Sequence, residues 1–159
     1  MCKYKDQINS VCDELIIKRA AQNKGSKIKN IVNNEHMCAI LKEGVPISYG
    51  TNLYRPNKIM IEHAESNAFK NLIKRRKNQN ILSKRIKVDV LIIRTNRSNS
   101  KPCVRCLNEM DSLKNMFNIR NVHYTSKDEL GGIRSVKFAD LIKEEHHICS
   151  YDIHYNIKN

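Results

Sequence analysis

The chain has 159 residues, 40% of them hydrophobic, so it can bury one core and is too short for two. Its longest apolar run, Val88–Ile93, contains Asp89 and is far too short to span a bilayer. The first residues also lack the apolar stretch of a secretory signal. These features argue against membrane and secreted classes. We therefore expect a single soluble, cytoplasmic domain with no membrane partner.

The chain is strongly basic, with 29 Lys and Arg against 16 Asp and Glu and a net charge of +13. Such an excess attracts polyanions, because binding releases counterions from phosphates. Codon usage in an AT-rich genome offers a second explanation, since the chain holds 19 Lys, 19 Asn and 20 Ile but only six Ala and five Gly. Nucleic acid is thus a candidate partner, and both explanations of the charge stay open.

The first half of the chain predicts a helix, a strand pair and a second helix. Apolar residues at helical spacing indicate an amphipathic helix over residues 6–22. Two short strands, His36–Leu41 and Pro46–Thr51, follow it and are joined by a turn that contains Gly44. The second helix is expected to begin near His63.

The second half begins with the clearest strand of the chain. β-Branched residues at Lys87–Thr95 are typical of a buried strand. Pro102 is expected in the first turn of a helix over Cys103–Phe117, where proline is best tolerated. A further strand is predicted at Asn121–Ser126. Strands that alternate with helices predict an α/β fold with helices on both sides of the sheet.

Two interpretations are open for the chain beyond residue 126. In the one that we favour, a Gly-Gly turn leads into an antiparallel strand at Ile133–Phe138, followed by a helix at Ala139–His146. In the other, Ser135–His147 is all helix and Ile148–Tyr155 forms the fifth strand.

Two short motifs carry the chemistry: His63-Ala64-Glu65 and Pro102-Cys103-Val104-Arg105-Cys106. Without a secretory signal, cysteines favour metal binding or catalysis over disulfides. A Cys-x-x-Cys at the start of a helix directs both sulfurs at one point, where the exposed N–H groups favour thiolates. Zinc takes four tetrahedral ligands, and catalytic zinc sites use three protein ligands and a water. His63, Cys103 and Cys106 are therefore the predicted Zn²⁺ ligands.

Glu65 has a different predicted role, as the group that moves protons rather than as a ligand. With the fourth zinc position open, zinc lowers the pKa of water from about 15.7 toward 7, and a nearby carboxylate can then accept the proton. A purely structural zinc site is the alternative. It needs a fourth protein ligand, for which Cys38, His36 or His123 are candidates, and it leaves Glu65 without a role.

The motifs resemble those of the cytidine deaminase superfamily, whose signature is His-x-Glu with Pro-Cys-x-x-Cys. The resemblance covers about residues 5–145, with 146–159 as a tail. It implies a three-layer α/β/α fold with a mixed five-stranded sheet. It also implies a hydrolytic deaminase in which Glu65 is catalytic. Tyr49-Gly50-Thr51-Asn52 resembles the family's Gly-x-Asn, so Asn52 inherits a role in substrate binding. A turn asparagine is the alternative for Asn52.

The resemblance points to cytosine in a free nucleoside or nucleotide as substrate, and to a homo-oligomer. His63–Ala68 looks most like deoxycytidylate deaminases, whereas Asn121–Leu141 looks like free cytidine deaminases. The N–H of Ala64 and the ring of Tyr124 are further candidate contacts to the base, although packing explains Tyr124 equally well.

Two rival functions remain open. One is a deaminase of cytosine or adenine in DNA or RNA, and the other is a catalytically silent, zinc-stabilised structural protein associated with nucleic acid. The spacing departs from the family pattern, because 36 residues separate Glu65 from Pro102. They include the basic stretch Lys74–Arg85, which is either a phosphate contact or a solvated helix end.

Overall fold

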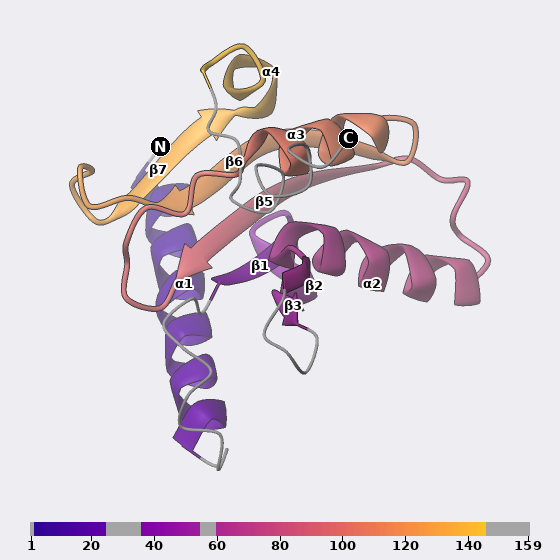
Figure 1. Ribbon diagram of the computed structural model, residues 1–159. Helices are drawn as coiled ribbons and strands as arrows, with labels where there is room; N and C mark the ends of the chain where they lie inside the picture. The colour runs from indigo at the N-terminus through magenta and orange to yellow at the C-terminus, as the bar shows by residue number, and fades with distance from the viewer. Residues whose placement is uncertain (1, 25–35, 55–59, 146–159) are drawn as a thin grey trace, which may run out of the picture.

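The computed structural model describes residues 2–24, 36–54 and 60–145 and shows an α/β fold built on a mixed sheet of five strands (Figure 1). The elements in chain order are α1 (Cys2–Lys24), β1 (His36–Lys42), β2 (Val45–Thr51), β3 (Leu53–Tyr54), β4 (Met60–Glu62), α2 (Ala64–Asn78), β5 (Ile86–Arg94), α3 (Val104–Ser112), β6 (Phe117–Thr125), β7 (Ile133–Lys137) and α4 (Phe138–Leu141). No helix in these ranges is long and apolar enough to cross a membrane.

The sheet has the strand order β2-β1-β5-β6-β7. The central pair, β5 and β6, is parallel, and every other neighbouring pair is antiparallel. A parallel pair needs a crossover connection, which here contains α3. The predicted α/β class with a mixed five-stranded sheet is therefore confirmed.

Helices cover both faces of the sheet, because side chains alternate along each strand. In β1, Met37 and Ala39 pack with the buried residues of α1, whereas Cys38 and Ile40 pack with those of α2 and α3. The buried residues of α1 recur at helical spacing and include Ile8, Cys12 and Leu15. The larger core lies on the α2 and α3 side, the side that also carries the motif residues.

Turns that contain glycine join the strands of two hairpins, β1–β2 and β6–β7. Glu43 and Gly44 have φ of 53° and 78°, the positive values that a two-residue turn requires between β1 and β2. Gly131 and Gly132, with φ of 89° and 73°, precede β7, which pairs antiparallel with β6. The favoured hairpin is thus confirmed, and the helix expected in the alternative is wrong because Ser135 lies within β7. Residues 148–155 lie outside the described residues.

Several boundaries differ from those expected. The first helix begins at Cys2, earlier than residue 6. The third helix ends at Ser112 instead of Phe117, because Phe117 is the first residue of β6. The Phe117 side chain is only 1% exposed and packs against Phe69, with ring centroids 5.3 Å apart. Burial of this ring and pairing with β5 therefore override the helical pattern.

Three further differences are smaller. Pro102 lies one residue before the N-cap Cys103 and not within the helix. The helix expected at 139–146 is a single turn, α4, in the residues that the structure describes. The short pair β3 and β4 was not expected, since two or three residues give too little pattern to detect.

Helix α2 packs so closely on β2 that a side chain does not fit at Gly50. A Cβ atom there would lie 2.3 Å from the carbonyl oxygen of Ala64 and 2.3 Å from the nitrogen of Ala68. The hydroxyl of Ser48 donates to the carbonyl of Ala68 at 2.8 Å. Close packing of strand and helix therefore places the end of β2 beside the start of α2.

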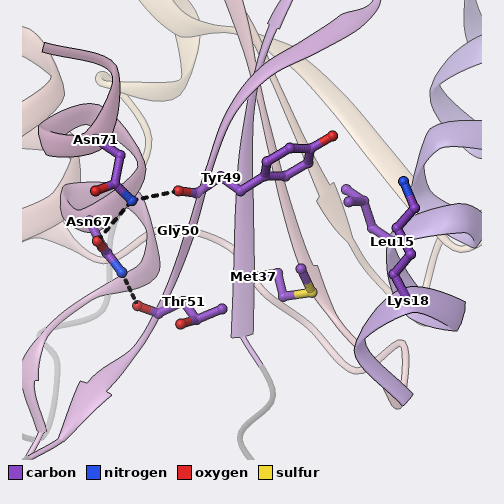
Figure 2. Close-up of a pocket in the computed structure, with 8 residues that line it drawn as sticks. All are labelled: Leu15, Lys18, Met37, Tyr49, Gly50, Thr51, Asn67 and Asn71. Carbon is purple, nitrogen blue, oxygen red and sulfur yellow. Dashed lines mark hydrogen bonds between the residues drawn. The ribbon is translucent and has the colours of Figure 1, made fainter. Parts of the chain in front are cut away.

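The outer edge of β2 is covered by asparagines of the same helix (Figure 2). Asn67 donates its amide to the carbonyl of Thr51, and Asn71 donates to that of Tyr49, both at 2.9 Å. Exposed strand edges invite pairing with other chains, and side-chain donors on these carbonyls reduce that tendency. The same bonds fix the chain just ahead of Asn52.

Candidate metal centre

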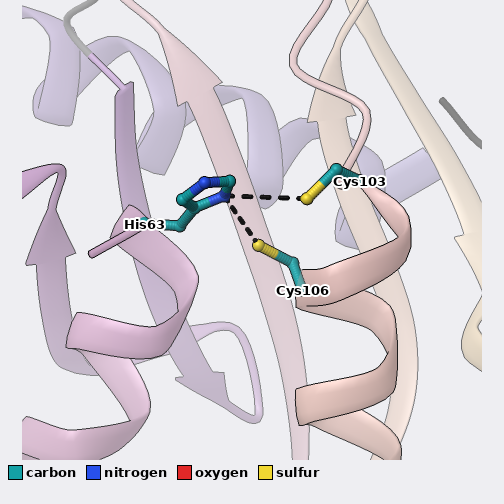
Figure 3. Close-up of side chains that lie close together, drawn as sticks. All are labelled: His63, Cys103 and Cys106. Carbon is teal, nitrogen blue, oxygen red and sulfur yellow. Dashed lines mark hydrogen bonds between the residues drawn. The ribbon is translucent and has the colours of Figure 1, made fainter. Parts of the chain in front are cut away.

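Three predicted ligands meet where two helices begin (Figure 3). His63 is the N-cap residue of α2 and Cys103 is the N-cap residue of α3, both with extended backbone. Cys106 lies in the first turn of α3. The carbonyls of the two N-cap residues accept the first helical hydrogen bonds, from Asn67 and Leu107. Each helix therefore directs its positive dipole end at this cluster, where it favours thiolates.

The ligand atoms lie at distances that fit a tetrahedral metal ion. His63 Nδ1 is 3.1 Å from Cys106 Sγ and 3.7 Å from Cys103 Sγ. All three ligand atoms lie within 4.8 Å of one another. A zinc ion with bonds of about 2.05 Å to nitrogen and 2.3 Å to sulfur separates these atom types by roughly 3.5 Å. The cluster can therefore hold a metal ion, and its donor set suits zinc.

The two thiols titrate as a pair. The pKa of Cys103 lies well below its usual range, first because the Cys106 thiol donates to it and further because His63 is close. The pKa of Cys106 is raised, since it gives that hydrogen bond to Cys103 and is buried. The pKa of His63 is also raised, chiefly by its hydrogen bond with Cys103. The surroundings thus favour a thiolate at Cys103, and a divalent cation would favour loss of the second thiol proton.

Glu65 lies beside the cluster and is not one of its three members. Its side chain is 4% exposed, and its Oε2 atom is buried without a hydrogen-bond partner. Burial raises the pKa of this carboxyl, and its own backbone N–H and His63 oppose that shift. A carboxyl with a raised pKa next to a candidate metal ligand set is suited to accept and return protons.

Asn52 lies in the segment between β2 and β3 and reaches the start of α2. Its Oδ1 accepts the N–H of Ala64 at 2.9 Å, and its Nδ2 donates to the hydroxyl of Tyr54 at 3.3 Å. The N-cap His63 makes no capping bond with its own side chain, so Asn52 performs that role from another segment. The N–H of Ala64, expected at the substrate, is thus occupied by Asn52 in this structure.

Tyr124 lies in β6 on the same side of the sheet, but its side chain is 1% exposed and belongs to the large core. Stacking on a base requires an accessible ring face, whereas burial in the core favours packing. Its role in substrate binding stays a prediction.

The alternative of a fourth protein ligand gains no support from the described residues. The metal-ligating group contains His63, Cys103 and Cys106 and no other His, Cys, Asp or Glu of that part of the chain. His123 lies on the opposite face of the sheet, where its ring contacts Tyr4. Three ligands from the described residues are the number that catalytic zinc sites use.

A contact that the sequence did not reveal joins the two helices beside the site. The hydroxyl of Ser66 in α2 donates to the carboxylate of Glu109 in α3, which also accepts from Arg105 Nε at 3.3 Å. A cavity of about 270 Å³ between these helices is bordered by Glu65 and Cys106. The spacing of Arg105 and Glu109 by four residues was a signal for their ion pair, but nothing in the sequence pointed to Ser66.

A second cavity, of about 330 Å³, lies away from the metal centre at the edge of β2 (Figure 2). Leu15 and Lys18 of α1, Met37 of β1 and Tyr49 of β2 border it.

A comparison with known protein families and with curated proteins found no match for this chain.

Proposed function

We propose that this chain is a zinc-dependent hydrolytic deaminase that converts a cytosine base to uracil, with a free nucleoside or nucleotide as substrate. The observation that carries the proposal is the pairing of a three-ligand group with a separate, buried carboxylate at one pair of helix starts. Three ligands suit catalytic zinc, and the carboxylate supplies the proton transfer that hydrolysis needs.

The burial of Glu65 favours an enzyme over a silent structural protein. A buried carboxylate with one oxygen, Oε2, left without a hydrogen-bond partner costs stability, and a scaffold gains nothing from it. Unfavourable groups of this kind are typical of active sites, where the cost is balanced by function.

The reaction adds water to C4 of the base and releases ammonia. Zinc held by His63, Cys103 and Cys106 would supply hydroxide at neutral pH, because it lowers the pKa of water. Glu65 accepts one proton of the attacking water and delivers it to the ring nitrogen. It then accepts the remaining proton of the hydroxyl on C4 and passes it to the amino group, as the C4–O double bond forms and the C4–N bond breaks. One water is consumed and one ammonia is formed, so Glu65 ends each turnover in its starting protonation state.

Asn52 is the proposed contact to the sugar or base. Its Oδ1 accepts from Ala64 and its Nδ2 donates one hydrogen to Tyr54, so the amide is held in one orientation and presents the second Nδ2 hydrogen as a donor. The substrate group that it contacts must therefore be an acceptor. Strand order and helices on both faces of the sheet support the three-layer cytidine deaminase-like fold as part of this proposal.

Ammonia release from cytidine, deoxycytidylate and single-stranded DNA or RNA tests the proposal. We expect release from a nucleoside or nucleotide, and a loss of about 10²–10⁴-fold in Glu65→Ala. Glu129→Gln, which changes an exposed carboxylate of the β6–β7 loop, serves as the matched control and should keep full activity. Equal activity of the Glu65→Ala variant and the wild type would contradict the mechanism.

A further inference from the structure

The two helices that begin at the metal centre run toward the same side of the molecule (Figure 1). α2 ends at Asn78 and α3 at Ser112, and the strands β5 and β6 begin there. The N–H of Ile86 donates to the carbonyl of Met116 at 3.2 Å, which joins the two connecting loops. Six exposed cations lie at this end of the fold, and we call them the basic end: Lys74, Arg75, Lys77, Lys84, Arg85 and Lys114.

The charge of the basic end has little local compensation. No acidic residue occurs between Glu65 and Asp89, and Asp89 itself is fully buried and bonded to Arg120. None of the six cations takes part in an ion pair among the described residues. Asp111, in the last turn of α3, is the acidic residue nearest in sequence to Lys114. Like charges in such a group repel, so the basic end attracts an anionic partner.

A seventh cation, Arg76, is buried beneath this group and is 6% exposed. Its guanidinium donates to the carbonyls of Ile81, at 2.7 Å, and Lys84, and its Nε has no partner. These bonds fold the loop after α2 back onto the helix, which brings Lys84 toward the last helical turn. Because carbonyls carry no full charge, the positive charge of Arg76 stays uncompensated and adds to the positive electrostatic potential of the basic end.

We propose that the basic end docks the phosphate backbone of nucleic acid, at a surface separate from the metal centre. The described aromatic side chains nearest to it, Phe69 and Phe117, are buried, so the surface offers no ring for stacking on bases. Contacts to phosphates alone are independent of base sequence. Stable binding to a lipid surface is strengthened by apolar anchors, and Ile81 is the one large exposed hydrophobic residue of this loop.

The distance between the basic end and the metal centre determines how long a bound strand must be to reach both. α2 has 15 residues and thus extends for about 22 Å between His63 and the basic end. At roughly 3.4 Å per nucleotide, a docked strand reaches the metal centre only after about six or seven nucleotides. Docking itself does not depend on the proposed deaminase activity, and it holds for the metal-free protein.

The test measures binding of a labelled single strand of about 20 nucleotides while salt rises from about 50 to 200 mM. A triple variant, Arg75→Gln with Lys77→Gln and Arg85→Gln, removes three exposed cations and leaves Arg76 in place. Its matched control, Lys127→Gln with Lys137→Gln and Lys143→Gln, removes the same charge from exposed positions around β7. Thermal unfolding checks that both variants are folded.

Each phosphate contact on a single strand contributes about −0.7 to the slope of log K against log salt. We expect the slope of the basic-end variant to be flatter by about 2, with little change in the control variant. Wild-type protein treated with a chelator should bind as tightly as untreated protein, which separates this proposal from the deaminase. Equal slopes in the two variants would overturn it and attribute binding to diffuse charge. Binding to anionic vesicles but not to the oligonucleotide would overturn it as well.

Discussion

Asn52 caps a helix to which it does not belong: its Oδ1 accepts the N–H of Ala64, the first residue of α2, at 2.9 Å. Substitution Asn52→Ala leaves that N–H without its partner. We expect a loss of about 1 kcal/mol in the free energy of unfolding, as for other helix caps. Urea unfolding of the purified variant measures it.

The substitution Asn52→Asp distinguishes the helix-capping role of Asn52 from its proposed role in substrate binding. Aspartate keeps the acceptor and lacks the amide donor, so its stability should match that of the wild type while KM for the substrate rises. If Asn52→Asp unfolds as easily as Asn52→Ala, the acceptor role assigned to Oδ1 is wrong.

Replacing the ionised carboxylate of Glu65 with a neutral side chain should stabilise the folded protein. Burial raises its pKa, so at pH values above about 4.3 the ionised form lowers the stability of the folded state. In metal-free protein at neutral pH, Glu65→Gln is expected to raise the free energy of unfolding by about 1–3 kcal/mol. Glu129→Gln should change it by less than about 0.5 kcal/mol. A destabilised Glu65→Gln variant would show that the carboxylate is well paired.

His123 makes stability depend on pH. Burial lowers its pKa, although Asp89 opposes the shift, and Nδ1 lies 2.8 Å from the hydroxyl of Ser135. Below about pH 6.5, His123 therefore binds a proton more readily in the unfolded chain than in the folded chain. The free energy of unfolding falls as the pH drops from that value. One such group contributes at most about 1.4 kcal/mol per pH unit.

Urea unfolding at several pH values should show this slope between about pH 6.5 and 5. The slope should be smaller in His123→Phe, which has no group to titrate. An unchanged slope in that variant would assign the pH dependence to other residues.

Gly50→Ala tests the close approach of β2 and α2. The added methyl would meet backbone atoms of Ala64 and Ala68 at 2.3 Å, and backbone cannot move aside as a flexible side chain can. We expect a loss of about 1–3 kcal/mol, read as a lower unfolding temperature. Val45→Ala, at an exposed position of the same strand, is the control and should change little. A stable Gly50→Ala variant would contradict the packing described.

The sequence predicted the central elements well because their patterns are strong. The β-branched run in β5 and the glycine turns at Gly44 and Gly131 correspond to local preferences that packing does not oppose. The three ligands were predicted from motif spacing, and the structure brings them within 4.8 Å.

Other features depend on tertiary contacts that a sequence does not display. The start of β6 was misplaced because Phe117 continues a helical pattern, while its burial against Phe69 decides otherwise. Arg76 belongs to a charged run that looks uniformly solvated, yet it folds inward to reach two carbonyls. The cap from Asn52 to Ala64 joins residues 12 positions apart, beyond any local capping pattern.

Metal content tests the central claim most directly, because the proposed function depends on metal binding by His63, Cys103 and Cys106. Elemental analysis of purified protein should find one zinc per chain in the wild type and in Glu65→Ala, since Glu65 is outside the candidate ligand group. The double variant Cys103→Ala with Cys106→Ala should hold none. Wild-type protein without zinc, or zinc retained by the double variant, would contradict the account.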